Sequence, residues 1–136
     1  MIVVDTGVLY ALVDASDDWH ARVLAWWRTA SGPIVVPVTI VPEITYLLHQ
    51  RISPAAERAF VVAVAKGEFA LEALETDDIE RAADVMQQYA DLGIGFVDAS
   101  VVAIAERLEA REIATTDRRH FGTIRPRHTR SFTLLP

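Results

Sequence analysis

Four acidic residues stand beside apolar segments in a pattern that could bring their carboxylates together. These residues are Asp5, Glu43, Asp98 and Asp117. Asp5 ends the apolar run IVV and Asp117 follows EIATT, so each comes at the end of an expected strand. Glu43 and Asp98 fall in the first turns of two expected helices. Because unpaired carboxylates in one place repel one another and raise their own pKa values, a divalent cation is the simplest compensation.

The donor atoms favour Mg²⁺ or Mn²⁺ over zinc. The chain has no cysteine, and its four histidines form no HxxxH or HExxH pairing, so the expected ligands are oxygens. Metal held in such a cluster polarises a phosphoryl oxygen and lowers the pKa of a bound water, which attacks in line. Thr6 and Thr115 supply hydroxyls that could orient a carboxylate or contact phosphate; local hydrogen bonding at the strand ends explains them equally well.

Each acid also has a structural explanation when it is taken alone. An aspartate after a strand commonly caps the next helix, which fits Asp5 and Asp117, and N-capping fits Asp98 as well. Glu43 has apolar residues three and four positions further on, which predicts a side chain on a largely apolar helix face. A partly exposed position is the alternative for Glu43. The metal-site interpretation requires all four carboxylates to meet at one edge of the fold.

Short apolar segments alternate with helical patterns along the whole chain, and these elements must position the acids. Strands are expected at 2–5, 34–37, 69–74, 112–116 and 131–135. Helices are expected at 7–14, 17–30, 39–52, 54–65, 76–92 and 97–110. Apolar, β-branched strands that alternate with helices predict an α/β fold with a parallel sheet covered on both faces. In such sheets, ligands bind beyond the carboxyl ends of the strands, where Asp5 and Asp117 are expected.

Length and composition predict one folded domain that spans residues 1–136. The chain is 51% hydrophobic and shows no repeat, linker or low-complexity segment. The absence of cysteine excludes a disulfide framework and fits a cytoplasmic location. The N-terminus lacks the basic and long apolar regions of a signal peptide. No apolar run approaches the roughly 18 residues of a membrane span, so no membrane association is expected.

Charge is distributed unevenly along the sequence. The formal net charge of −6 argues against a nucleic-acid partner. However, seven of the 13 basic residues lie between positions 107 and 130, where only three acids occur. The basic residues are Arg107, Arg111, Arg118, Arg119, Arg125, Arg127 and Arg130. This segment is either a solvated charged face or a contact surface for a polyanion.

The segments IVVDTGVLYAL, PEITYLL, GFVDASVVAIAERL and IATTDRRHF, in this order, resemble PIN-domain ribonucleases, in particular VapC toxins of bacterial toxin–antitoxin pairs. The resemblance covers essentially the whole chain. It implies a three-layer α/β/α fold with a central parallel sheet of about five short strands. It also implies Mg²⁺- or Mn²⁺-dependent endonucleolytic cleavage of RNA, with transfer RNA or ribosomal RNA as the expected substrate.

The resemblance assigns roles to the same four acids. Asp5 and Asp98 match positions of direct metal ligands, and Glu43 and Asp117 match positions that complete the cluster, directly or through waters. Thr6 and Thr115 match the accompanying hydroxyls. Arg118, Arg119 and His120 are candidate RNA contacts beside the pocket. Asp91 is either an additional acid of the site, as in some branches of the family, or an ordinary residue at a helix end.

The resemblance further implies a homodimer that a VapB-type antitoxin keeps inactive. The expected helix with Trp19, Trp26 and Trp27 is either a surface for that partner or an ordinary part of the core. Three other functions stay open: a PIN nuclease of RNA processing that is no toxin, a non-catalytic RNA-binding module, and a Mg²⁺-dependent phosphatase or phosphoacceptor domain. The last is disfavoured because Gly7 stands where a haloacid-type enzyme has a second aspartate.

Overall fold

The fold is built on five short strands and seven α-helices, and the computed structural model describes all residues from 1 to 136. The strands are β1 (Ile2–Val4), β2 (Ile34–Pro37), β3 (Ala70–Glu72), β4 (Glu112–Ala114) and β5 (Thr133–Leu135). The α-helices are α1 (Thr6–Val13), α2 (His20–Trp27), α3 (Val41–Arg51), α4 (Pro54–Ala65), α5 (Thr76–Gln88), α6 (Phe96–Arg107) and α7 (Arg118–Thr123). Two short 3₁₀ turns, η1 (Val38–Ile40) and η2 (Ala90–Leu92), precede α3 and follow α5.

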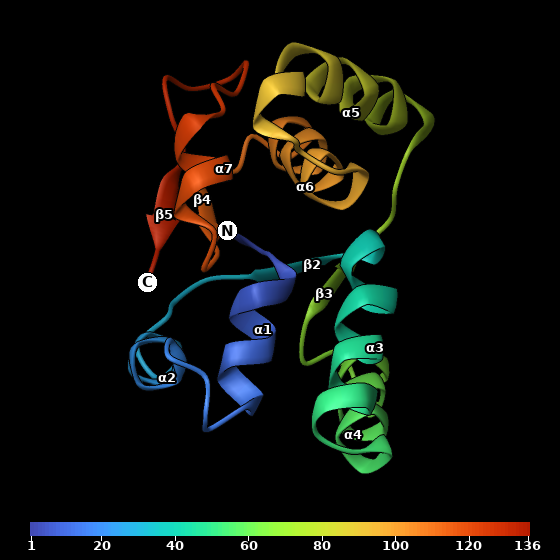
Figure 1. The fold of residues 1–136 in the computed structure, drawn as a ribbon, viewed down its shortest axis with the longest axis vertical. Helices are drawn as coiled ribbons and strands as arrows, with labels where there is room; N and C mark the ends of the chain where they lie inside the picture. The colour runs from blue at the N-terminus through green and yellow to red at the C-terminus, as the bar shows by residue number, and fades with distance from the viewer.

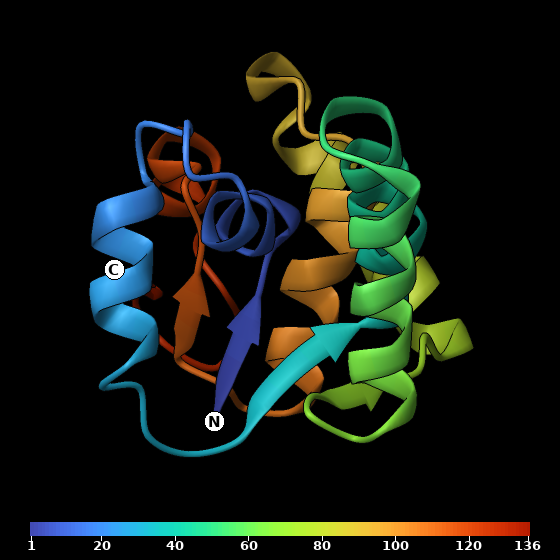
Figure 2. The same cartoon turned by 90° about the horizontal axis from the view of Figure 1, so that it is seen from below.

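All five strands are parallel and lie in the order β3-β2-β1-β4-β5. The chain therefore moves outward from β1 to β2 and β3 and then crosses to β4 and β5 on the other side of β1. The strand order reverses between β1 and β4, whose arrowheads point the same way (Figure 2). Crevices at such reversals, beyond the carboxyl ends of the strands, are where open α/β sheets bind ligands.

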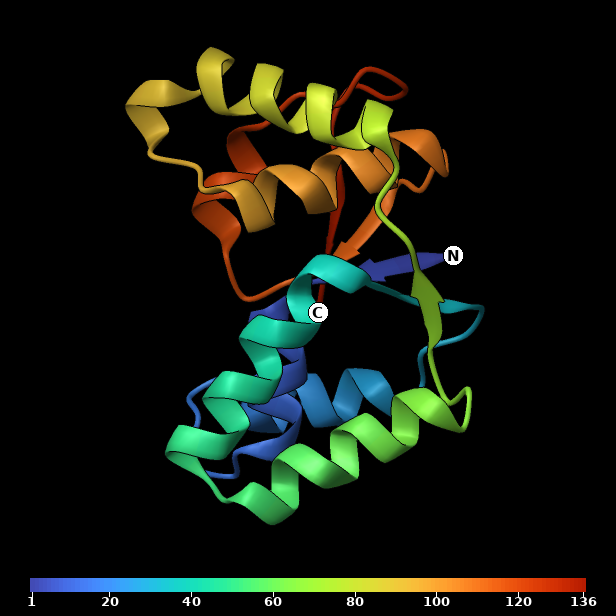
Figure 3. The same cartoon turned by 90° about the vertical axis from the view of Figure 1, so that its right-hand side faces the viewer.

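Helices cover both faces of this sheet, which gives the three layers that the sequence predicted. Helices α1 to α4 lie on one face, and α5 and α6 lie on the other (Figures 1 and 3). Parallel strands buried on both faces need continuous apolar sequence, and the strands IVV and IVVP supply it. Helix α6 lies between the sheet and α5, so seven consecutive residues from Ala99 to Ala105 are buried.

The three tryptophans of the α2 region belong to the core. Trp19, Trp26 and Trp27 are all partly buried and pack against the hydrophobic cluster. The rings of Trp26 and Trp27 meet edge to face with centroids 5.8 Å apart, and Trp27 lies 5.9 Å from Phe69. These contacts favour the core interpretation over the partner surface. None of the helices combines the length and the apolar character that crossing a membrane requires.

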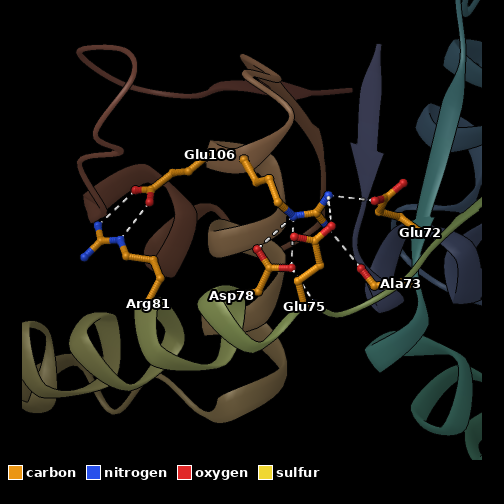
Figure 4. A network of polar contacts seen from close by, with 7 residues as sticks. Glu72, Ala73, Glu75, Asp78, Arg81 and Glu106 are labelled. Carbon is orange, nitrogen blue, oxygen red and sulfur yellow. Dashed lines mark hydrogen bonds and ion pairs between the residues drawn. The ribbon is translucent and has the colours of Figure 1, made fainter.

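A network of ion pairs fixes the end of α6 against α5 and β3 (Figure 4). The Arg107 guanidinium donates to the buried Asp78 carboxylate at 3.0 Å, to Glu72 at 2.9 Å and to the Ala73 carbonyl at 3.0 Å. Glu75 lies 3.4 Å from the same guanidinium. These partners, led by the Asp78 hydrogen bonds, raise the pKa of Arg107 above its ordinary value. Arg107 therefore serves the fold and is no part of a free basic surface.

A second pair in this network joins α5 to α6. Arg81 donates two hydrogen bonds to the Glu106 carboxylate, at 2.7 and 2.9 Å. The Arg127 backbone N–H also donates to Glu106 at 3.0 Å, which attaches the C-terminal loop to the helix pair. Burial opposes ionisation of Glu106, but the hydrogen bonds from Arg81 and Arg127 outweigh it and lower the pKa of this carboxyl.

Candidate metal centre

Asp5 follows β1 directly and is the N-cap residue of α1. The Thr6 backbone N–H donates to Asp5 Oδ1 at 2.7 Å, and the Thr115 hydroxyl donates to Asp5 Oδ2 at 2.9 Å. The side chain is only 6% exposed. Asp5 therefore caps helix α1, as the structural explanation predicted, and presents a fixed carboxylate at the carboxyl edge of the sheet.

Thr115 links the first acid to the last. Its buried hydroxyl donates to Asp5 and accepts a hydrogen bond of 2.9 Å from the Asp117 backbone N–H. Asp117 in turn is the N-cap residue of α7, because its Oδ1 accepts from the His120 backbone N–H at 2.9 Å. The loop after β4 thus holds Asp117 beside the end of β1.

Asp98 lies in the first turn of α6 and faces Asp117 across His120. His120 Nδ1 lies 2.8 Å from Asp117 Oδ2 and 3.2 Å from Asp98 Oδ2. Ligand atoms of the three side chains lie within 4.8 Å of one another. The sequence placed His120 beside the pocket as an RNA contact, whereas the structure places its ring among the acids.

The electrostatics of the cluster are those of uncompensated carboxylates. Burial, followed by repulsion from Asp98, raises the pKa of Asp5 to about 7, against the lowering effect of its two hydrogen bonds. Burial, followed by repulsion from Asp117, also raises the pKa of Asp98, although His120 opposes the rise. No arginine or lysine forms an ion pair with Asp5, Glu43, Asp98 or Asp117.

Glu43 approaches the same cluster from the first turn of α3. Its negative charge contributes to the raised pKa of both Asp5 and Asp98. Of the two positions left open for Glu43, the apolar helix face is wrong and an exposed position is correct, because Glu43 is exposed and Tyr46, one turn further on, is 65% exposed. The buried stripe of α3 contains Ile44 and Leu48 instead.

Thr6 and Asp91, the remaining candidate residues of the acidic cluster, differ in their contacts. The Thr6 hydroxyl is buried without a hydrogen-bond partner, and only the backbone of Thr6 contacts Asp5. Asp91 is exposed in η2 and forms no hydrogen bond or ion pair with the four acids. The direct contact between η2 and the cluster is made by the Leu92 carbonyl oxygen, which lies 3.1 Å from His120 Nε2.

Arg118 and Arg119 are adjacent in sequence but have different surroundings. The Arg118 guanidinium donates to the carbonyls of Leu134 and Pro136 at the C-terminus and lies over the Trp19 ring, 5.4 Å from its centroid. Arg119 is exposed, and its guanidinium forms no ion pair or hydrogen bond. Arg118 therefore holds the C-terminal strand, whereas the Arg119 guanidinium has no partner within the chain.

The residues present fit a divalent cation. Asp5, Asp98 and Asp117 offer hard oxygen donors, Glu43 adds negative charge, and no arginine or lysine forms an ion pair with any of them. The His120 ring also lies in the cluster and offers a nitrogen atom beside these oxygens.

Residues 2–125 match the family described as PIN domain. The chain belongs to the PIN domain family. This PIN domain is 36% identical, over 99% of its own length and 100% of the relative's, to Ribonuclease VapC26 of Mycobacterium tuberculosis (strain ATCC 25618 / H37Rv). It is therefore of the VapC type.

Solved structures of the same fold are VapC and related toxins. Mycobacterium tuberculosis VapC20, described as a sarcin-ricin loop cleaving toxin, matches with a TM-score of 0.83 and 21% identity, over 88% of this PIN domain and 92% of VapC20. A toxin–antitoxin complex from Klebsiella pneumoniae matches with a TM-score of 0.71 and 18% identity, over 91% and 92% of the two chains. These similarities confirm the three-layer PIN fold.

Proposed function

We propose that this PIN domain is a Mg²⁺- or Mn²⁺-dependent endoribonuclease and the toxin of a VapBC-type pair. The observation that carries the proposal is the meeting of Asp5, Asp98 and Asp117 at the point where the strand order reverses, with no arginine or lysine paired to them. The name of the relative, Ribonuclease VapC26, supports the reaction class.

The bound ion would supply a polarised phosphoryl oxygen and a water of lowered pKa. Asp5, Asp98 and Asp117 would hold this ion, and Glu43 would add negative charge at the mouth of the cluster. Thr115 and the Thr6 N–H fix the two oxygens of Asp5, so its carboxylate need not reorganise during the reaction. The chain's own contribution is a set of ligands held in place before substrate arrives.

We propose RNA as the substrate, held by its phosphates. Arg119 is exposed two residues after Asp117, on the same helix as His120, so its guanidinium could bind the backbone next to the scissile phosphate. VapC20 is described as a toxin that cleaves the sarcin-ricin loop. Ribosomal RNA or transfer RNA is the substrate class that we propose here.

We also propose that a VapB-type antitoxin binds this chain and that the toxin is a cytoplasmic homodimer. The support for the antitoxin is that several structural neighbours are toxin–antitoxin complexes. Size-exclusion chromatography with light scattering would measure the mass of the chain alone, and a single-chain mass at micromolar concentration would contradict the homodimer.

Cleavage of total RNA with mapped ends tests the enzymatic proposal. We expect cleavage with Mg²⁺ or Mn²⁺, none with EDTA, and a loss of at least about a hundredfold for Asp5→Asn and for Asp98→Asn. Asp91→Asn is the matched control, since Asp91 is exposed and its carboxylate forms no hydrogen bond or ion pair with the cluster. Circular dichroism would verify the fold of each variant. Wild-type rates in both Asp5→Asn and Asp98→Asn, or cleavage unaffected by EDTA, would contradict the proposal.

A further inference from the structure

His120 is held by contacts at both of its ring nitrogens. Nδ1 faces the carboxylates of Asp117 and Asp98, at 2.8 and 3.2 Å, and Nε2 lies 3.1 Å from the Leu92 carbonyl oxygen. The ring is held from two elements, since α7 carries it and η2 supplies the carbonyl. This arrangement gives the ring one fixed orientation.

The Leu92 contact decides which nitrogen carries the hydrogen. A carbonyl oxygen only accepts hydrogen bonds, so Nε2 carries a hydrogen and donates it to Leu92, which leaves Nδ1 as the ring nitrogen that can bind an ion beside the carboxylates. Histidines that bind metal ions in proteins almost always donate their other N–H to a carbonyl or a carboxylate in this way.

The distances around Nδ1 agree with ligands of one ion. Neighbouring ligand atoms of an octahedral ion that binds each at about 2.1 Å are about 3.0 Å apart. The distances from Nδ1 to the oxygens of Asp117 and Asp98 are 2.8 and 3.2 Å, on either side of this value. A hydrogen bond from a protonated Nδ1 to Asp117 gives a similar distance, and the experiment below separates the two roles.

We propose that His120 Nδ1 is a ligand of the metal ion, together with Asp98 and Asp117, and that this nitrogen makes the site prefer Mn²⁺ to Mg²⁺. The inference rests on the metal site of the proposed function and deepens it. Imidazole favours first-row transition ions, whereas Mg²⁺ takes oxygen ligands and dehydrates reluctantly. Losing the nitrogen would therefore weaken binding of Mn²⁺ more than binding of Mg²⁺.

Pulsed electron paramagnetic resonance of the Mn²⁺-loaded protein tests the ligand directly. We expect a nitrogen coupling that changes from the ¹⁴N to the ¹⁵N pattern when histidine is ¹⁵N-labelled, and that disappears in His120→Gln. His49→Gln is the matched control, because His49 is exposed and pairs with Glu57 away from the acidic cluster. The labelling experiment uses the unaltered chain, so it stays decisive even if His120→Gln does not fold.

Calorimetric titration with each metal tests the preference. We expect His120→Gln to weaken Mn²⁺ binding by about tenfold or more and Mg²⁺ binding by less than about threefold. The absence of nitrogen coupling, or equal losses for the two metals, would overturn the proposal. RNA cleavage by the same samples separates the two claims: nitrogen coupling without cleavage contradicts the ribonuclease, and cleavage without nitrogen coupling contradicts the ligand.

Discussion

Thr115 donates its hydroxyl hydrogen to Asp5 Oδ2 at 2.9 Å, and this bond joins residues 110 positions apart in the sequence. The same hydroxyl accepts from the Asp117 N–H, so one buried oxygen aligns the ends of two neighbouring strands. The orientation of the Asp5 carboxylate therefore depends on a residue that is fully buried.

Replacing Thr115 by valine should reduce RNA cleavage by about tenfold to a hundredfold. Valine keeps the volume but leaves Asp5 Oδ2 without its donor and the Asp117 N–H without its acceptor. Thr115→Ser keeps the hydroxyl and should retain most of the activity. Cleavage rates at saturating Mn²⁺, with thermal melts to verify folding, measure the effect. Equal activity of the serine and valine variants would show that the hydroxyl has no part in positioning Asp5.

Asp5→Asn should stabilise the metal-free protein at pH 8 and leave its stability nearly unchanged at pH 4. The pKa of Asp5 is raised from 3.8 to about 7, so folding favours the protonated carboxyl. The protonated Asp5 carboxyl therefore stabilises the fold fully below about pH 4. This stabilisation is lost as the pH rises through about 7. The loss is up to about 4 kcal/mol, at about 1.4 kcal/mol for each pKa unit.

Urea unfolding at both pH values, in EDTA, measures this difference. Asp91→Asn serves again as the control, because it removes an exposed carboxylate outside the cluster. If the difference in the free energy of unfolding between the wild type and Asp5→Asn is the same at pH 4 and at pH 8, ionisation of Asp5 does not destabilise the fold.

Arg107→Met should lower the free energy of unfolding by about 2–4 kcal/mol. The substitution leaves the Asp78 carboxylate, which is only 3% exposed, without its guanidinium partner. Arg127→Met is the control, because the Arg127–Asp84 pair is exposed at 3.5 Å and should contribute less than about 1 kcal/mol. Urea denaturation compares the two variants, and similar losses in both would contradict a special role for Arg107.

Arg119→Ala and Arg118→Ala should affect different properties: the first RNA binding, the second stability. Arg119→Ala should weaken RNA binding several-fold without changing the melting temperature, because its guanidinium has no partner within the chain. Arg118→Ala should lower stability by about 1–2 kcal/mol, because it removes the bonds to the C-terminal carbonyls and the stacking on Trp19. Fluorescence anisotropy with a labelled RNA in the Asp98→Asn background, together with melts, measures both. Weaker RNA binding for Arg118→Ala alone would reverse the assignment.

The strands and most helices were predictable because each combines an apolar pattern with a clear boundary. The helix start at Ser53-Pro54 is an example, since the Ser53 hydroxyl accepts from the Ala56 N–H at 3.1 Å. Helix α7 was missed because its six residues, RRHFGT, are too few to show a helical period. The expected helix at 76–92 ends at Gln88, and η2 follows it.

The part of the site that could be predicted from the sequence consists of the acids that directly follow strands. Asp5 and Asp117 come at strand ends of adjacent parallel strands, so the sheet places them together. His120 could have been assigned to the cluster if α7 had been foreseen, because its spacing of three from Asp117 puts both on one helix face. The sequence could not decide between an apolar and an exposed position for Glu43, because Tyr46 and Leu47 resemble a core stripe in sequence although Tyr46 is exposed.

The reversal of strand order between β1 and β4 has a consequence for biosynthesis. Asp5 and Asp117 follow β1 and β4, which are neighbours in space. The ribosome nevertheless makes β2 and β3 between these two strands, so β4 is made long after β1. A nascent chain that stops before Glu112 lacks β4, the Thr115 hydroxyl bonded to Asp5, and Asp117 and His120. An incomplete chain therefore cannot form the proposed metal centre, which is complete only once β4 and α7 have been made and have folded.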